Sequence, residues 1–127
     1  MTELISTELI NQVRELNIAK GWRSGPGAEG PTEGPWFPAY LSLIHSEVTE
    51  ALEAYRDKVW SSTRKVLAGN GHISEVDKPV GVGPELADVI IRVVDTADIW
   101  DIDLNREISR VLTYGWTRPY QHGGRTF

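Results

Sequence analysis

The sequence predicts an all-α fold: a helical bundle of about four helices, completed by homo-oligomerisation, in a single domain over residues 1–127. Apolar residues recur at three- and four-residue steps in four segments, which is the spacing of one helix face. Glycine and proline gather mainly between these segments, where regular structure is interrupted. Short helices that are this apolar also indicate burial across a subunit interface.

The first helix is expected over residues 2–20, where Gly21 can end it. Residues 23–38 are rich in glycine and proline and have no periodic pattern, so no regular structure is expected there. The second helix is expected over residues 39–60. Its apolar face consists of Leu41, Ile44, Val48, Ala51, Leu52, Tyr55 and Val59.

Residues 61–82 are expected to be irregular, with a short helical extension allowed at 64–67. The third helix is expected to start at Gly83 and Pro84, because proline is favoured at the first helical position. Its apolar face consists of Leu86, Val89, Ile90, Val93, Val94 and Ala97. The fourth helix is expected over residues 103–114, with Gly115 as its stop.

Composition narrows the classes of function. The chain has 127 residues, a net charge of −5 and no cysteine, so disulfides and thiolate metal sites are excluded. The chain has no Lys/Arg cluster dense enough to bind the phosphate backbone, so binding to long nucleic acid is not expected. The first ten residues lack the basic and apolar regions of a secretory signal, and no apolar run approaches the roughly 18 residues of a membrane span. We therefore expect a cytoplasmic protein with no membrane partner.

Two acidic pairs stand out. Glu47 and Glu50 lie three residues apart on the second expected helix, and Glu85 and Asp88 repeat this spacing on the third. Residues at this spacing share a helix face, and each pair borders an apolar arc. If the two apolar faces pack together, all four carboxylates meet in one groove.

Four carboxylates in one groove repel one another, so a cation is expected among them. Oxygen ligands select Mg²⁺, Mn²⁺ or Ca²⁺, and magnesium takes phosphate oxygens as its remaining ligands. The groove is thus predicted to bind a triphosphate through its metal. The competing interpretation is that each pair is a solvated helix face. Arg92 and Asp95 lie on the same stripe as Glu85 and Asp88, where an intrahelical pair together with a surface or interface contact is the favoured role for both.

The segments 43–56 (LIHSEVTEALEAYR) and 85–95 (ELADVIIRVVD) resemble the MazG-like nucleotide pyrophosphohydrolases of the all-α NTP pyrophosphatase superfamily. The shared signature is E-x-x-E on one helix and E-x-x-D on the next. The tail TRPYQHGG is also similar to the close of single-domain relatives. The resemblance extends over roughly residues 9–22 and 39–124.

The resemblance implies an enzyme that cleaves a nucleoside triphosphate between its α- and β-phosphates, giving a monophosphate and pyrophosphate. It implies catalytic metal ligands at Glu47, Glu50, Glu85 and Asp88. The implied cofactor is Mg²⁺, with Mn²⁺ as a possible substitute, and the implied nucleophile is a water activated by the metal. The implied assembly is a homodimer or a tetramer.

Four further residues are candidates for substrate binding. Trp22 and Trp36 flank the 23–38 segment, where a tryptophan in some relatives stacks on the base, but packing at the rim is an equal alternative. Arg118 matches a basic tail position that can reach phosphate, and Arg92 is the fourth candidate. Ser46 stands where many relatives carry a glutamate. Two other functions stay open: a non-catalytic helical oligomerisation or regulatory module, and a phosphoribosyl-ATP pyrophosphohydrolase.

Overall fold

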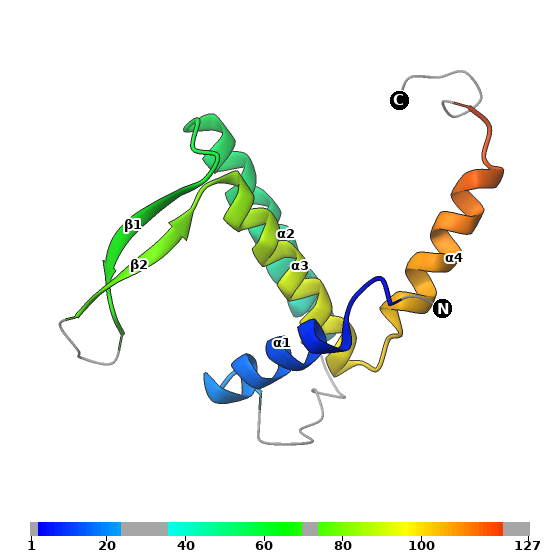
Figure 1. The fold of residues 1–127 in the computed structure, drawn as a ribbon, viewed down its shortest axis with the longest axis horizontal. Coiled ribbons are helices and arrows are strands. Elements are labelled where there is room, and N and C mark those ends of the chain that lie inside the picture. The colour runs from blue at the N-terminus through cyan, green and yellow to red at the C-terminus, as the bar shows by residue number, and fades with distance from the viewer. Residues whose placement is uncertain (1–2, 24–35, 70–73, 121–127) are drawn as a thin grey trace. The chain divides into compact units, whose positions relative to one another are not determined.

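The computed structural model describes residues 3–23, 36–69 and 74–120. The described residues form four helices and one β-hairpin (Figure 1). In chain order these are α1 (Thr7–Ala19), α2 (Trp36–Arg56), β1 (Ser62–Leu67), β2 (Glu75–Val80), α3 (Val82–Ile99) and α4 (Leu104–Thr117). The fold is therefore mostly helical but not purely all-α. Most of the 23–38 segment and the last residues of the tail lie outside the described residues.

The chain divides into two compact units. Unit 1 comprises Met1–Gly30 and Ala97–Phe127, and unit 2 comprises Pro31–Thr96. The boundary falls within α3, so most of that helix belongs to unit 2. None of the helices in the described ranges is both long enough and apolar enough to cross a membrane.

Helix α1 begins later than the sequence pattern suggests, because Ser6 caps it. The Ser6 backbone is extended, with φ −71° and ψ 148°, and its Oγ accepts the backbone N–H of Leu9 at 3.0 Å. Just before the cap, Leu4 and Ile5 donate their backbone amides to Asn105 Oδ1, each at 2.7 Å. The expectation of a helix from residue 2 is therefore wrong, since these amides bond to Asn105 instead of lying in a helix.

Within unit 1, Asp98 near the end of α3 holds two arginines. Arg14 donates from Nε and Nη2 to the two carboxylate oxygens at 2.8 and 2.6 Å, and Arg23 donates from Nη1 at 2.9 Å. The hydrogen bonds from Arg14, followed by those from Arg23, hold the pKa of Asp98 below its ordinary value against the opposing effect of burial. These charge-assisted bonds join the end of α3 to α1 through Arg14, and to Arg23, which follows the turn at the end of α1.

Helix α2 is displaced along the chain relative to the expected 39–60. It starts at Trp36 and ends at Arg56. The early end has a local cause, because Lys58 adopts a left-handed backbone with φ 60° and its N–H donates to the carbonyl of Tyr55 at 2.9 Å. The reversed chain then brings Trp60 edge-on to the Tyr55 ring, with 5.8 Å between ring centroids.

The hairpin is the largest departure from the sequence-based expectation. Strands β1 and β2 pair antiparallel, with a register that starts at Ser62 opposite Val80. Irregular structure over 61–82 and a helical extension at 64–67 are therefore both wrong. The physical reason is that nearly every side chain of both strands is exposed, so neither strand has the alternation of apolar and polar residues that predicts a half-buried strand.

The base of the hairpin is tied to the end of α2 by backbone hydrogen bonds. Val82 N donates to the carbonyl of Val59 at 3.0 Å, and Gly83 N donates to the carbonyl of Trp60 at 2.9 Å. Gly81 has φ +123°, and a Cβ there would lie 2.7 Å from the backbone C and O of Trp60. Only glycine tolerates both the positive φ and the close approach. The start of α3 is thereby held against the chain that leaves α2.

Helix α4 also runs further than expected. Asp103 caps it, with Oδ1 accepting the backbone N–H of Arg106 at 3.0 Å. The helix continues through Gly115, so the expectation that Gly115 stops it is wrong. It ends at Thr117, and Arg118 is extended with ψ 149°, because the residue before a proline, here Pro119, is disfavoured in the helical conformation.

Unit 2 buries little apolar surface. Among its described residues, Ala51 and Val94 are the buried hydrophobic side chains. Large apolar side chains line one stripe of α2 and the first half of α3, and each is 44–57% exposed. They are Leu41, Val48, Leu52 and Tyr55 on α2, and Leu86 and Ile90 on α3.

The anchoring role of Gly81 leads to a prediction about stability. Replacing Gly81 by alanine should lower the free energy of unfolding by about 1–3 kcal/mol, because the new Cβ meets backbone atoms and φ is positive. Urea denaturation checks this. Gly69→Ala is the matched control, since its Cβ would meet nothing within 4 Å. Equal stability of Gly81→Ala and the wild type would contradict the anchoring role.

Candidate metal centre

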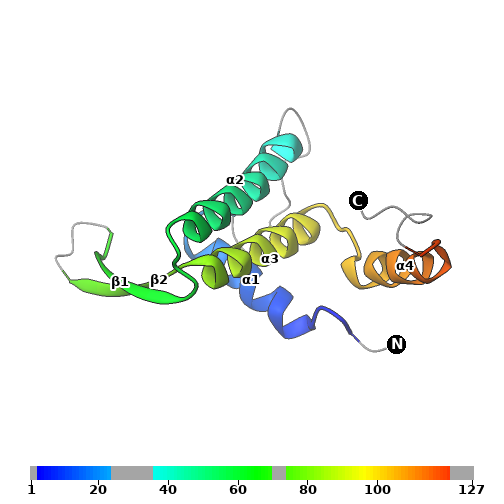
Figure 2. The same ribbon diagram turned by 90° about the horizontal axis from the view of Figure 1, so that it is seen from above.

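Three glutamates that lie close together, Glu47, Glu50 and Glu85, come from two antiparallel helices of unit 2. Glu47 and Glu50 lie one turn apart on α2, and Glu85 lies in the first turn of α3. The two helices lie side by side, and the hairpin leaves from the end at which α2 stops and α3 begins (Figures 1 and 2). The bonds between the Val59–Trp60 turn and the start of α3 set this end of the pair, so Glu85 is brought beside α2.

The carboxylates of these three glutamates converge. One oxygen from each of Glu47, Glu50 and Glu85 lies within 4.8 Å of the others. Glu47 is buried, with 8% of the residue exposed, while Glu85 is half-buried and Glu50 is exposed. Glu85 Oε2 is a buried oxygen that has no hydrogen-bond partner among the described residues. A buried carboxylate oxygen without a donor is costly, so this cluster favours a cation.

Arg92 balances part of this charge. Its Nε donates to Glu47 Oε1 at 2.9 Å, and the two side chains are 39% and 10% exposed. The Arg92 side chain thus reaches across from α3 to α2, where the sequence pattern had favoured a pair within its own helix. One arginine beside three carboxylates leaves an excess of negative charge in the cluster.

This excess charge acts on the proton affinity of Glu50. A hydrogen bond shared with Glu47, followed by burial and the charges of Glu47 and Glu85, raises the pKa of Glu50 to about 7. A proton near neutral pH is one way to relieve the repulsion, and a divalent cation is another. The same group therefore exchanges a proton for a metal when one binds.

Asp88 lies outside the group of three but within its electrostatic reach. Burial, then the charges of Glu47 and Glu85, raise the pKa of Asp88, and the positive charges of Arg92 and Lys78 act in the opposite direction. Three of the four predicted ligands are thus brought together. Asp88 is exposed, and its charge interacts with those of Glu47 and Glu85 although it is not among the three converging carboxylates.

The other residues that the sequence singled out lie elsewhere. Trp22 follows α1 and is 68% exposed, and Arg118 follows α4, so both belong to unit 1. The side chain of Trp36 lies outside the described residues. The Ser46 hydroxyl donates to the carbonyl of Leu43 within its own helix at 2.8 Å. Substrate contacts by Trp22, Trp36 and Arg118 stay predictions.

Lys78 is a neighbour of this cluster that sequence reasoning missed. It lies on β2, which leads directly into α3, and its charge acts on Asp88 in the first half of that helix. The sequence held one usable signal, the Asn70-Gly71 dipeptide between two segments with β-branched residues, since this dipeptide favours tight hairpin turns.

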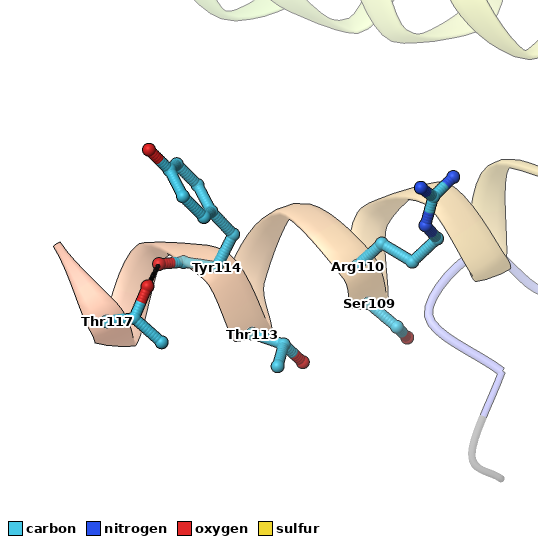
Figure 3. A pocket seen from close by; sticks show the side chains of 5 residues that line it. All are labelled: Ser109, Arg110, Thr113, Tyr114 and Thr117. Carbon is cyan, nitrogen blue, oxygen red and sulfur yellow. Dashed lines mark hydrogen bonds between the residues drawn. The ribbon is translucent and has the colours of Figure 1, made fainter.

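A cavity of about 400 Å³ lies along α4 and is a weaker candidate site. All the residues that line it come from successive turns of that one helix: Ser109, Arg110, Thr113, Tyr114 and Thr117 (Figure 3). Arg110 is already paired with Glu107 at 2.9 Å, and the lining has no carboxylate. The carboxylate cluster is therefore the better candidate for a metal site than this cavity.

The donor set of the cluster fits a small, hard cation. Carboxylate oxygens are the protein ligands that magnesium prefers, and two ligands on opposite sides of the ion lie about 4.2 Å apart at bond lengths of about 2.1 Å. The three oxygens all lie within 4.8 Å of one another, so they form a group that could hold a metal ion. The exposed position of Glu50 leaves the cluster open to solvent on one side, as a site that also takes water or phosphate requires.

In comparisons with protein-family models, with curated proteins and with solved structures, the chain showed no match. The case for a function therefore depends on the residues of the cluster and on their surroundings.

The raised pKa of Glu50 predicts how the stability of the metal-free protein changes with pH. The folded state keeps the Glu50 proton up to about pH 7, whereas the unfolded chain loses it near its ordinary value of 4.5. In EDTA the free energy of unfolding should therefore fall as the pH rises between these two values. Urea denaturation across this pH range measures the decrease in the free energy of unfolding. The decrease should be smaller in Glu50→Gln than in the wild type, and in Glu53→Gln it should equal that of the wild type. An equal fall in Glu50→Gln and the wild type would refute the assignment.

Proposed function

We propose that this chain is a Mg²⁺-dependent nucleoside triphosphate pyrophosphohydrolase of the MazG-like kind, acting between the α- and β-phosphates. The observation that carries the proposal is the convergence of Glu47, Glu50 and Glu85, from two helices, into one cluster. The order of the acidic pairs along the chain supports it further, since E-x-x-E precedes E-x-x-D as in that family.

A cation explains the cluster better than a solvated helix face does. Solvated carboxylates on a helix point apart into water. Here Glu47 is buried, Glu85 Oε2 has no hydrogen-bond partner among the described residues, and both side chains lie close to Glu50. Arg92 offsets only one of these charges. Mg²⁺ is the cation we propose, with Mn²⁺ as a substitute, because both prefer oxygen ligands.

The chain's own residues divide the work. Glu47 is held in place by Arg92, so its free oxygen is oriented before any ligand arrives. Glu50 and Glu85 supply oxygens from the two helices, and Asp88 adds negative charge at the exposed edge. When bound, the metal neutralises phosphate charge and activates water. Trp22 and Trp36 are proposed to contact the base, and Arg118 is proposed to contact a phosphate.

The first test of this function is a set of charge-neutralising variants. Glu47→Gln, Glu50→Gln, Glu85→Gln and Asp88→Asn should each lower kcat/KM by about 100-fold or more, because each removes one negative charge from the site. EDTA should abolish turnover of the wild type. Pyrophosphate release from a panel of NTPs and dNTPs with Mg²⁺ or Mn²⁺ is the measurement.

Metal-free stability separates loss of a ligand from loss of the fold. Glu50→Gln and Glu85→Gln should keep or raise the melting temperature in EDTA, because repulsion is relieved. Glu47→Gln should instead cost up to about 1 kcal/mol, since it breaks the ion pair with Arg92. Glu53→Gln is the matched control, because Glu53 is an exposed glutamate of the same helix outside the cluster. If the four site variants hydrolyse NTPs as the wild type does, the enzyme proposal fails and a non-catalytic module is the better interpretation.

We also propose that the assembly is a homodimer or a tetramer. The exposed stripe of α2 runs through Leu41, Val48, Leu52 and Tyr55, at steps that keep all four on one side of the helix. Apolar stripes of this length in water favour association. A second copy of the same chain is the partner that a helix-rich unit with so few buried residues needs.

Light scattering at micromolar concentration should therefore report a dimer or a tetramer. Leu52→Glu should shift the mass toward the monomer, because it places a charge in the middle of the apolar stripe. Glu53→Gln, at the neighbouring position, should leave the mass unchanged. A monomeric mass for the wild type throughout this range would rule out the proposed assembly.

A further inference from the structure

The two faces of the β1–β2 hairpin carry different charge. Residues directly opposite each other in an antiparallel pair share a face, and the register places Arg64 opposite Lys78 and Lys65 opposite Asp77. Lys65 and Asp77 form an ion pair. Arg64 and Lys78 have the same sign and form no ion pair with any of the described residues. One face is therefore neutral at this point, and the other presents two positive charges.

Two like charges directly opposite each other destabilise a strand pair. Both side chains are exposed, and an exposed two-stranded hairpin has little else to stabilise it. A bound anion would remove this repulsion. Val66 and Val76 lie opposite each other on the same face, one step further from the base, so the charge of this face comes from Arg64 and Lys78.

The strand that carries Lys78 leads directly into α3, the helix that carries Glu85. The hairpin base is tied to the end of α2 and the start of α3 by backbone hydrogen bonds, and a Cβ at Gly81 would lie 2.7 Å from the Trp60 backbone. Glu85 follows within the first turn of α3, and its N–H donates to the Gly81 carbonyl at 3.1 Å. The charge of Lys78 also reaches Asp88, where it opposes the rise of that pKa caused by burial and the glutamates.

We propose that Arg64 and Lys78 bind the terminal phosphates of the nucleotide, and that the hairpin selects triphosphates over monophosphates. This inference rests on the proposed function, because it places the metal-binding end of the same ligand at Glu47, Glu50 and Glu85. An arginine fork binds phosphate oxygens in pairs, and a lysine adds a point charge. The terminal phosphates carry most of the charge of a triphosphate, so they gain most from two adjacent cations.

Inorganic pyrophosphate is the probe, because it represents the terminal phosphates without base or sugar. Titration calorimetry in the presence of Mg²⁺ should give a Kd that rises about tenfold in Arg64→Gln and in Lys78→Gln. Lys65→Gln is the matched control, a lysine on the same strand whose side chain lies on the other face, and its Kd should stay at the wild-type value. Binding of Mg²⁺ alone should not weaken in any of the three. The melting temperature of Arg64→Gln and Lys78→Gln should stay level or rise, since the like-charge repulsion is removed.

Turnover of NTPs, measured on the same proteins, distinguishes the two proposals. An NTP KM that rises in both variants while kcat stays near wild type supports the phosphate site. Unchanged pyrophosphate affinity in both variants, or no pyrophosphate binding to the wild type, overturns it, and the hydrolase proposal then stands or falls on its own variants. If pyrophosphate affinity depends on Arg64 and Lys78 but no nucleotide is hydrolysed, the anion site stands and the hydrolase proposal fails.

Discussion

The ion pair between Arg92 and Glu47 is the constraint on which the arrangement of the carboxylates depends. It joins α3 to α2 through a buried glutamate. A pair in such a position costs desolvation, and its bond to a donor must offset that cost. With Glu47 held by Arg92, the carboxylates of Glu50 and Glu85 lie close to it, and the three share an excess of negative charge. The raised pKa of Glu50 is the direct consequence.

The charges of unit 2 are sorted in space, although the chain as a whole is acidic. The acidic residues face each other between two helices, and basic residues without ion pairs gather on one face of the hairpin that joins those helices. A polyphosphate–metal complex carries both signs of charge in a complementary order. The backbone hydrogen bonds from Val82 and Gly83 to Val59 and Trp60 matter for this reason, because they join the hairpin base to both helices.

Stability and assembly are linked through the same two helices. The buried residues of unit 2 include the charged Glu47 and Asp95 beside Ala51 and Val94, while the large apolar residues of α2 are exposed. Two helices that bury charged and polar side chains gain little stability from that burial. Association through the exposed stripe would supply the apolar burial that these helices lack, and it would leave the carboxylates available for a ligand.

The sequence alone predicted the existence of all four helices, because their apolar periodicity is local and each cap lies within a few residues of the helix that it starts. It also predicted the acidic pairs, since a three-residue step places two side chains on one helix face whatever the rest of the chain does. The hairpin escaped prediction because its strands are exposed on both faces and leave no periodic signal. The partner of Arg92, the raised pKa of Glu50 and the closeness of Lys78 to Asp88 were decided only in the tertiary structure. The strength of these interactions depends on distance and burial, which no local pattern encodes.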